Sequence, residues 1–183
     1  MKLKLYTTIS AATLILGIIA GLETTTPTQE AQQLIEPLRE IAKQYMPYTI
    51  QTVILILAKN LVAVIVMWLS GTLLTIPTIA SLALNGYIIG IAIALTGDTA
   101  KALIAILPHG VIELPAVIIA GACGLRIGVE AARKIASIIS HGKASMKKAF
   151  KETIKPMTVS IILLIPAAII EVYVTPTLIA ILS

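Results

Sequence analysis

Long apolar stretches with few charged residues constrain this chain more than any other feature of its sequence. The first covers residues 5–22, and the others cover 49–76, 79–95, 101–125 and 157–174. Each approaches the ~20 residues that a helix needs to cross a bilayer. Hydrophobic residues make up 57% of the chain and charged residues 13%, whereas a soluble domain carries about 45–50% and about 25%. The sequence therefore predicts an all-α, polytopic transmembrane helix bundle of about five spans, with residues 1–183 forming a single integral membrane domain.

The segments that precede and follow the first span are polar. Residues 1–4 are basic, as in a signal peptide, but no clear Ala-x-Ala cleavage site follows, so we expect an uncleaved first span. Between the first two spans, Leu34, Leu38 and Ile41 recur every three or four residues. This spacing predicts an amphipathic helix over residues 27–47, on the outer membrane surface or packed against the spans.

Charged residues are distributed unevenly between the connecting segments. Residues 23–43 contain four glutamates against two basic residues, whereas residues 126–155 contain two glutamates against eight basic residues. These eight are Arg126, Arg133, Lys134, Lys143, Lys147, Lys148, Lys151 and Lys155. Short basic loops stay on the cytoplasmic side of a membrane. We therefore expect a multi-pass protein of the cell membrane with a cytoplasmic N-terminus, a cytoplasmic 126–155 segment and an external C-terminus.

Prolines divide the later spans. Pro108 and Pro115 lie inside the fourth span, and we expect two half-helices that meet at residues 108–110. Pro156 is expected to start the fifth span, and Thr175-Pro176 to end it before a short apolar tail. The basic 126–155 segment between these spans is expected to be helical from 126 to about 139 and again from 145 to 153.

A few polar residues interrupt the apolar stretches. A charged residue in hydrocarbon costs ~2.5–3.5 kcal/mol or more, so such residues face a partner or a water-filled cavity. At about 1.5 Å per helical residue, most of them fall at similar depth in the outer half of the bundle. Lys59 is the one cation among them, and we expect Glu113 or Glu171 to be its counter-ion. The expected intramembrane cluster is Lys59, Asn60, Asn85, His109, Glu113 and Glu171.

His109 and Glu113 are four residues apart and share one face if the backbone there is helical. They could form a metal, proton or substrate site, or a buried hydrogen-bonded network that fixes helix register. One histidine and one glutamate supply too few ligands for a metal without help from other spans. We favour the structural network, and we expect no metal, no cofactor and no catalytic residue.

Small residues recur every fourth position in two spans, and such faces let helix backbones approach closely. We expect these residues to pack helices together, within the fold or between protomers. They are Gly86, Gly90 and Ala94 in the third span, and Ala116, Ala120, Gly124 and Gly128 from the fourth span onward. Cys123 lies among them, and we expect an inert buried thiol.

The basic residues of the 126–155 segment have two interpretations. They can serve only to set the topology, or they can contact anionic lipid headgroups or a cytoplasmic partner, each adding ~1 kcal/mol of attraction to the surface. Only one aromatic residue, Phe150, lies among these charges, so we do not expect nucleic acid to bind.

Several motifs resemble the signature of the stage II sporulation protein M family. The longest is Leu-Pro-His-Gly-Val-Ile-Glu-Leu-Pro-Ala at 107–116, followed by Gly-Leu-Arg-Ile-Gly at 124–128. Shorter motifs at 59–61, 84–90 and 170–176 fit the same family. The resemblance implies a multi-span protein that scaffolds or remodels membrane, without identifying a reaction. The isoleucine-rich composition indicates an archaeal or thermophilic relative.

Three functions follow from these features. A self-associating scaffold that remodels membrane fits the small-residue faces, and its expected partners are the lipid bilayer, further copies of the chain and a membrane or cell-envelope protein. A transporter or channel with a polar site formed by His109, Glu113, Lys59 and Glu171 fits ionisable residues at membrane depth. An intramembrane hydrolase that uses His109 and Glu113 is the third, and enzymatic activity is what we expect least.

Overall fold

The computed structural model describes residues 2–24, 45–140 and 144–182, and within these ranges the chain forms helices and no strand. Five helical segments of this described part are long and apolar enough to cross a membrane. Four are α1 (Lys2–Leu22), α3 (Ile50–Ser70), α4 (Ile76–Leu95) and α5 (Thr99–Ser140). The fifth is continuous through α6 (Met146–Ile169), the π-helix η2 (Ile170–Val174) and α7 (Thr175–Leu182). The predicted all-α fold with five apolar helices is confirmed.

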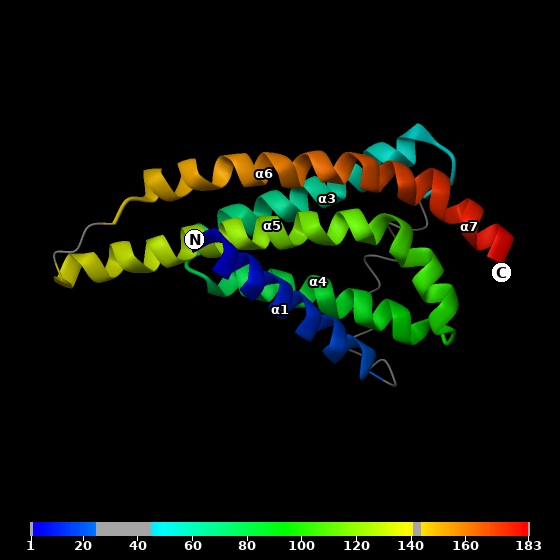
Figure 1. Cartoon of the computed structure of the whole chain (residues 1–183), viewed down its shortest axis with the longest axis horizontal. Helices are drawn as coiled ribbons and strands as arrows, with labels where there is room; N and C mark the ends of the chain where they lie inside the picture. Colours follow the sequence, from blue (N-terminus) through cyan, green and yellow to red (C-terminus); the bar gives the residue numbers. More distant parts are fainter. Residues whose placement is uncertain (1, 25–44, 141–143, 183) are drawn as a thin grey trace.

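The helices run along the long axis of the molecule (Figure 1). α6, α3 and α5 lie in the upper part of this view, and α1 and α4 lie below them. α1 packs mainly against α4, and α5 packs mainly against α6. The N-terminal end of α1 lies toward the same end as the α5–α6 connection, whereas the C-terminus lies at the opposite end. This is the arrangement that five successive crossings require.

α1 and α4 cross in close contact through glycines. A Cβ atom added to Gly90 would lie 2.8 Å from Cα of Gly21, and one added to Gly21 would lie 2.9 Å from Cα of Gly90. Gly86 lies against the backbone of Leu14, and Gly17 against that of Ala83. The small-residue face of α4 is therefore occupied within the chain. The sequence analysis had not identified its complement, Gly17 and Gly21.

The small-residue face of α5 is also covered within the chain. Ala116 and Ala120 are fully buried. A Cβ atom on Gly124 would lie 2.5 Å from the Met67 carbonyl oxygen, and one on Gly128 would lie 2.7 Å from the Leu74 carbonyl group. α5 therefore lies directly against the end of α3 and the turn that follows, which includes the short 3-10 helix η1 (Gly71–Leu73). The buried thiol of Cys123 lies on the same part of α5.

The expected break in the fourth span is wrong. α5 continues through Pro108 and Pro115 for 42 residues, and Figure 1 shows a bend in its first part instead of two separate half-helices. A proline removes one backbone hydrogen bond and bends a helix, but the helix continues when packing on both sides compensates.

The helix that contains the fifth span is longer at both ends than expected. α6 begins at Met146, where the Ser145 hydroxyl accepts a hydrogen bond from the Lys148 N–H at 3.3 Å, so Pro156 lies inside the helix. Thr175-Pro176 does not end the span, because η2 leads into α7. The amphipathic helix expected over 27–47 lies outside the described residues, apart from 45–47.

Candidate functional site

All five spanning segments contribute to one cavity of about 260 Å³ inside the bundle. Its polar lining residues are Lys59 of α3, Asn85 of α4, His109 and Glu113 of α5, and Glu171 of η2, while Leu14 of α1 adds an apolar wall. His109 lies ten residues from the start of α5, or roughly 15 Å along the helix axis. The structure thus brings five of the six residues of the expected intramembrane cluster to one place at membrane depth.

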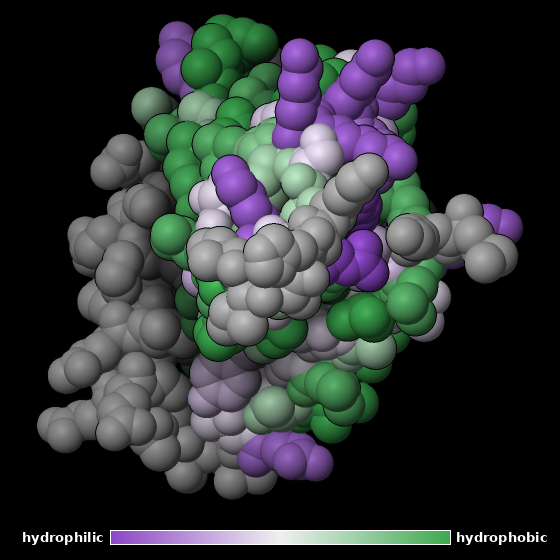
Figure 2. Space-filling model, turned by 90° about the vertical axis from the view of Figure 1, so that its left-hand side faces the viewer, coloured by the Kyte–Doolittle hydropathy of each residue, from purple (hydrophilic) through white to green (hydrophobic). Residues whose placement is uncertain are grey.

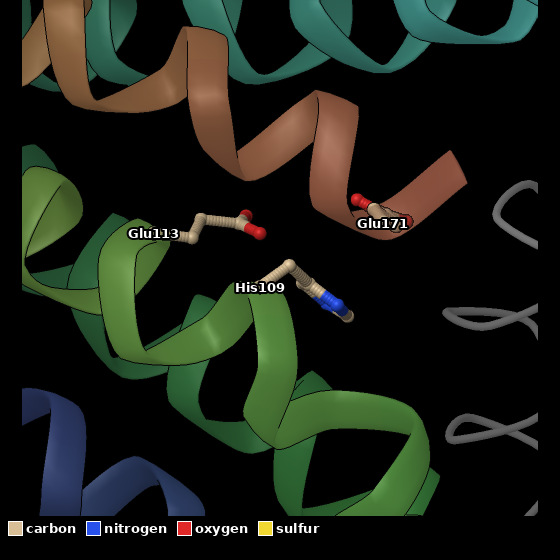
Figure 3. Close-up of side chains that lie close together, drawn as sticks. All are labelled: His109, Glu113 and Glu171. Carbon is tan, nitrogen blue, oxygen red and sulfur yellow. The ribbon is translucent and has the colours of Figure 1, made fainter. Parts of the chain in front are cut away.

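His109, Glu113 and Glu171 form the centre of this cavity. One nitrogen of His109 and one carboxylate oxygen of each glutamate all lie within 4.8 Å of one another. Figure 3 shows His109 and Glu113 on successive turns of α5, with the Glu171 side chain approaching from the facing helix. Each side chain is partly buried. The two carboxylates and the imidazole therefore converge from two separate segments of the chain.

The π-helix η2 determines where Glu171 lies. The Thr175 N–H donates to the Ile170 carbonyl, five residues earlier. In an α-helix the Val172 carbonyl would accept from residue 176, but Pro176 has no N–H to donate. The Val172 carbonyl instead accepts a hydrogen bond of 3.3 Å from the Tyr48 N–H. Single π turns inside α-helices are frequent at functional sites, and here the turn carries Glu171.

Thr175 connects this π turn to the imidazole of His109. Its buried hydroxyl donates to the Ile170 carbonyl at 3.3 Å, and its Oγ1 lies 3.4 Å from Nδ1 of His109. A hydroxyl has only one proton to donate. When the hydroxyl donates to Ile170, the contact with His109 places the proton on Nδ1 and the lone pair on Nε2. Thr175 is a site residue that the sequence analysis assigned only to a helix break.

The remaining polar residues of the expected cluster have different environments. Lys59 lines the cavity but is exposed, and within the described part of the chain it forms no ion pair with Glu113 or Glu171. Asn85 Nδ2 donates to the Ser81 carbonyl of its own helix at 2.8 Å. Asn60 is buried outside the cavity lining, and its Nδ2 has no hydrogen-bond partner among the described residues. The expected pairing of Lys59 with Glu113 or Glu171 is thus not observed.

A second, mostly apolar groove of about 450 Å³ adjoins the cavity. It lies between α3, α5 and α7, and Ile56, Ala105 and Ile179 are among its lining residues. His109 and Glu171 line both the groove and the cavity. These two side chains therefore form the boundary between an apolar groove and a polar interior.

The basic segment forms a separate structure at the end of α5 and α6. Arg126 is buried and pairs with Glu130 at 2.9 Å and with Glu152 at 2.7 Å, so it is not available to a lipid headgroup. Glu130 also accepts from the Ser145 N–H at 2.8 Å. Lys143 lies outside the described residues. The other basic side chains are exposed, namely Arg133, Lys134, Lys147, Lys148, Lys151 and Lys155.

Hydrophilic side chains gather at this end of the molecule. Figure 2 looks onto that end and shows them above and around the centre, beside hydrophobic flanks. Isoleucine, leucine and valine side chains are exposed along all the spanning helices. An apolar circumference with a charged end is the surface that a membrane-embedded bundle requires.

Comparisons with known proteins agree with the sequence motifs. The family model described as stage II sporulation protein M matches residues 10–176. An uncharacterized protein of Methanocaldococcus jannaschii is 32% identical over 125 residues, which cover 66% of this chain and 69% of that protein. No solved structure matches the chain. With its five apolar helices, the chain belongs to the stage II sporulation protein M family of membrane proteins.

Proposed function

We propose that this member of the stage II sporulation protein M family is a transporter, and that the cavity containing His109, Glu113 and Glu171 is its substrate site. One observation carries the proposal, namely that ionisable side chains from three different spans meet in a cavity at membrane depth. Ionisable groups in the hydrocarbon region are costly, and they mark ion pathways and proton relays in membrane proteins.

The apolar groove beside the cavity supports a pathway. His109 and Glu171 border both spaces, so a small movement of either side chain would connect them. Lys59 is exposed at the edge of the cavity. The cavity therefore has ionisable groups at its border with the groove and an exposed lysine in its lining, which supports a substrate site on a pathway.

Flux measurements in proteoliposomes test this function. The full chain is reconstituted with reporters for protons, Zn²⁺ or Mn²⁺ inside the vesicles, and a gradient of each ion is applied in turn. We expect flux of at least one ion above that of protein-free vesicles, and we expect Glu113→Gln and Glu171→Gln to reduce it to background. Glu23→Gln, at the exposed end of α1, should retain full flux. Equal flux with and without protein for all three ions would reject the proposal.

A second candidate function is self-association of the protein as a membrane scaffold that remodels the bilayer. The small-residue faces of α4 and α5 are occupied within the chain and do not support it. A different surface does, since an apolar groove of about 580 Å³ lies between α1 and α4 and is lined by Leu16, Gly17 and Ala83 among others. Its apolar lining suits contact with a helix of a second copy of the chain.

Introducing bulk into that groove tests the scaffold function. Ala20 lines the groove, and Ala20→Trp should convert oligomers to monomers in light scattering of detergent-solubilised protein. It should also abolish any change in vesicle shape that the native chain causes. A native chain that is already monomeric and leaves vesicles unchanged would exclude the scaffold.

A further inference from the structure

We propose that His109, Glu113 and Glu171 bind one divalent first-row transition-metal cation, of the series from Mn²⁺ to Zn²⁺, inside the bundle. The inference rests on the proposed function for the role of the ion as cargo, whereas binding itself follows from the three side chains. It departs from the sequence-based expectation of no metal, because the structure places Glu171, carried by the π turn, close enough to His109 and Glu113 to be a third ligand.

The separation of the three side chains fits one ion. Ligand atoms bound to Zn²⁺ lie about 2.0–2.2 Å from it, so two of them lie at most about 4.4 Å apart. The three ligand atoms here lie within 4.8 Å of one another. Closing the remaining few tenths of an ångström requires only small side-chain rotations, and the cavity around them leaves space for these.

The type of ligand selects the class of ion. An imidazole nitrogen suits zinc, iron, nickel and copper, whereas Mg²⁺ and Ca²⁺ prefer sites made wholly of oxygen. One nitrogen and two carboxylates therefore favour the first-row transition metals over the alkaline-earth ions. Three protein ligands also leave a coordination position for water, as in zinc sites that exchange ligands.

The hydrogen bond to Thr175 prepares His109 for this role. Metal-binding histidines commonly donate their second ring N–H to a nearby oxygen, which fixes the tautomer and the ring orientation. When the Thr175 hydroxyl donates to Ile170, the tautomer that keeps the contact with Thr175 carries its proton on Nδ1 of His109. The unprotonated Nε2 is then the nitrogen that can bind a cation.

The charges of the cavity also favour a cation. Glu113 and Glu171 face each other within 4.8 Å in a low-dielectric environment, and two ionised carboxylates that close repel strongly unless a positive charge lies between them. Among the described residues, Lys59 is the single cationic side chain that lines the cavity, so Lys59, Glu113 and Glu171 sum to −1 when all are ionised. The competing explanation is a proton shared by the two carboxylates, and the experiment must separate it from a metal.

The test uses the full chain, purified in detergent and freed of metal with a chelator. Zn²⁺ binding is measured by calorimetry, and Co²⁺ serves as a spectroscopic probe of coordination. We expect one ion per chain, a Co²⁺ spectrum typical of four or five ligands, and much weaker binding of Mg²⁺. His109→Ala, Glu113→Gln and Glu171→Gln should each weaken binding by more than the ~10–100-fold that loss of a ligand's hydrogen-bonding partner costs.

Two matched controls test whether the effect is specific. His141→Ala removes the other of the chain's two histidines, and Glu23→Gln removes an exposed glutamate. Both should leave the affinity and the Co²⁺ spectrum unchanged. Loss of the signal in His141→Ala, or its persistence in all three site variants, would show that the metal binds elsewhere and would overturn the proposal.

A measurement on the native chain avoids the risk that a variant fails to fold. An ion that binds only the folded protein raises its melting temperature in proportion to the logarithm of its concentration. We expect Zn²⁺ to raise the melting temperature and a chelator to reverse this shift. Absence of both stoichiometric binding and a shift in melting temperature would favour the shared proton and overturn the metal site. Metal binding without ion flux would reject the proposed transport and leave the metal site standing. Ion flux without metal binding would reject the metal site and leave transport standing.

Discussion

Nη2 of Arg126 on α5 lies 2.7 Å from Oε2 of Glu152 on α6, and Nη1 of the same guanidinium lies 2.9 Å from Glu130. The Arg126 side chain is only 7% exposed and that of Glu130 only 9%. One guanidinium therefore connects the two helices at the basic end of the bundle, in a place where the side chains of Arg126 and Glu130 are largely shielded from water.

Removal of this guanidinium should destabilise the protein. Loss of one member of a buried ion pair costs about 3–5 kcal/mol, because the other charge stays buried without its partner. Arg126→Met should therefore reduce the free energy of unfolding by about that amount, measured in detergent. Arg133→Met is the control, since that side chain is 52% exposed and 3.8 Å from Glu130, and its loss should cost less than ~1 kcal/mol. Equal effects of the two substitutions would contradict this assignment.

Added bulk at the α1–α4 crossing should separate these helices. Gly90→Ala places a Cβ 2.8 Å from Cα of Gly21, and overpacking of this kind costs about 1–3 kcal/mol. Gly110→Ala is a matched control, because its Cβ would meet nothing closer than the Ile106 side chain at 3.4 Å. Thermal unfolding should show a lower melting temperature for Gly90→Ala, and an unchanged or higher one for Gly110→Ala.

The number and order of the spans were predictable from the sequence, because they follow from the positions and lengths of its apolar stretches. The similar depth of His109 and Glu113 was predictable for the same reason. The π turn was not, since it arises from an interaction between distant segments, in which the Val172 carbonyl accepts from the Tyr48 N–H. Proline was interpreted as a helix break, and the structure shows that helices bend around it or change their hydrogen-bonding pattern.

Pairing between helices was the second feature that local sequence could not provide. The face of Gly86 and Gly90 was evident from its spacing, but its partner face on α1 requires knowledge of which helices are neighbours. Likewise, Arg126 looked like part of a solvated basic segment, whereas Glu152 is brought beside it only by the α5–α6 contact.

The Thr175 hydroxyl should affect metal affinity without touching the ion. Thr175→Val removes the oxygen that accepts from Nδ1 of His109, and loss of such a partner weakens metal binding by about 10–100-fold. Thr175→Ser keeps the hydroxyl and should restore most of the affinity for Zn²⁺. Calorimetric titration of both variants provides the comparison, and equal affinities for Val and Ser would argue that the hydroxyl does not position the imidazole.

Labelling of introduced cysteines should establish the orientation. In a Cys123→Ala background, cysteine replaces Lys134 near the end of α5, or Asp98 in the turn between α4 and α5. Both native residues are exposed. The excess of basic residues predicts that Lys134 is cytoplasmic, so a membrane-impermeant maleimide should label Asp98→Cys in intact cells and Lys134→Cys only after lysis. The reverse pattern would invert the proposed topology.

The exposed lysines of α6 should bind anionic headgroups. Each basic residue near an anionic surface adds ~1 kcal/mol, so replacing Lys147, Lys148, Lys151 and Lys155 by Gln should weaken the preference for anionic lipid. The measurement compares melting temperatures in nanodiscs of anionic and zwitterionic lipid at low and high salt. The native chain should be more stable in anionic lipid at low salt, and a salt-independent difference would point to another cause.

The π turn at η2 makes the number of residues in this segment as important as their identity. Deleting one residue between Glu171 and Thr175 would restore the α-helical pattern and rotate Glu171 by about 100° relative to Thr175. A relative could then keep the histidine and both glutamates and still be unable to bring them together. Alignments of such proteins should therefore be inspected for a one-residue gap here before shared residues are taken to mean a shared site.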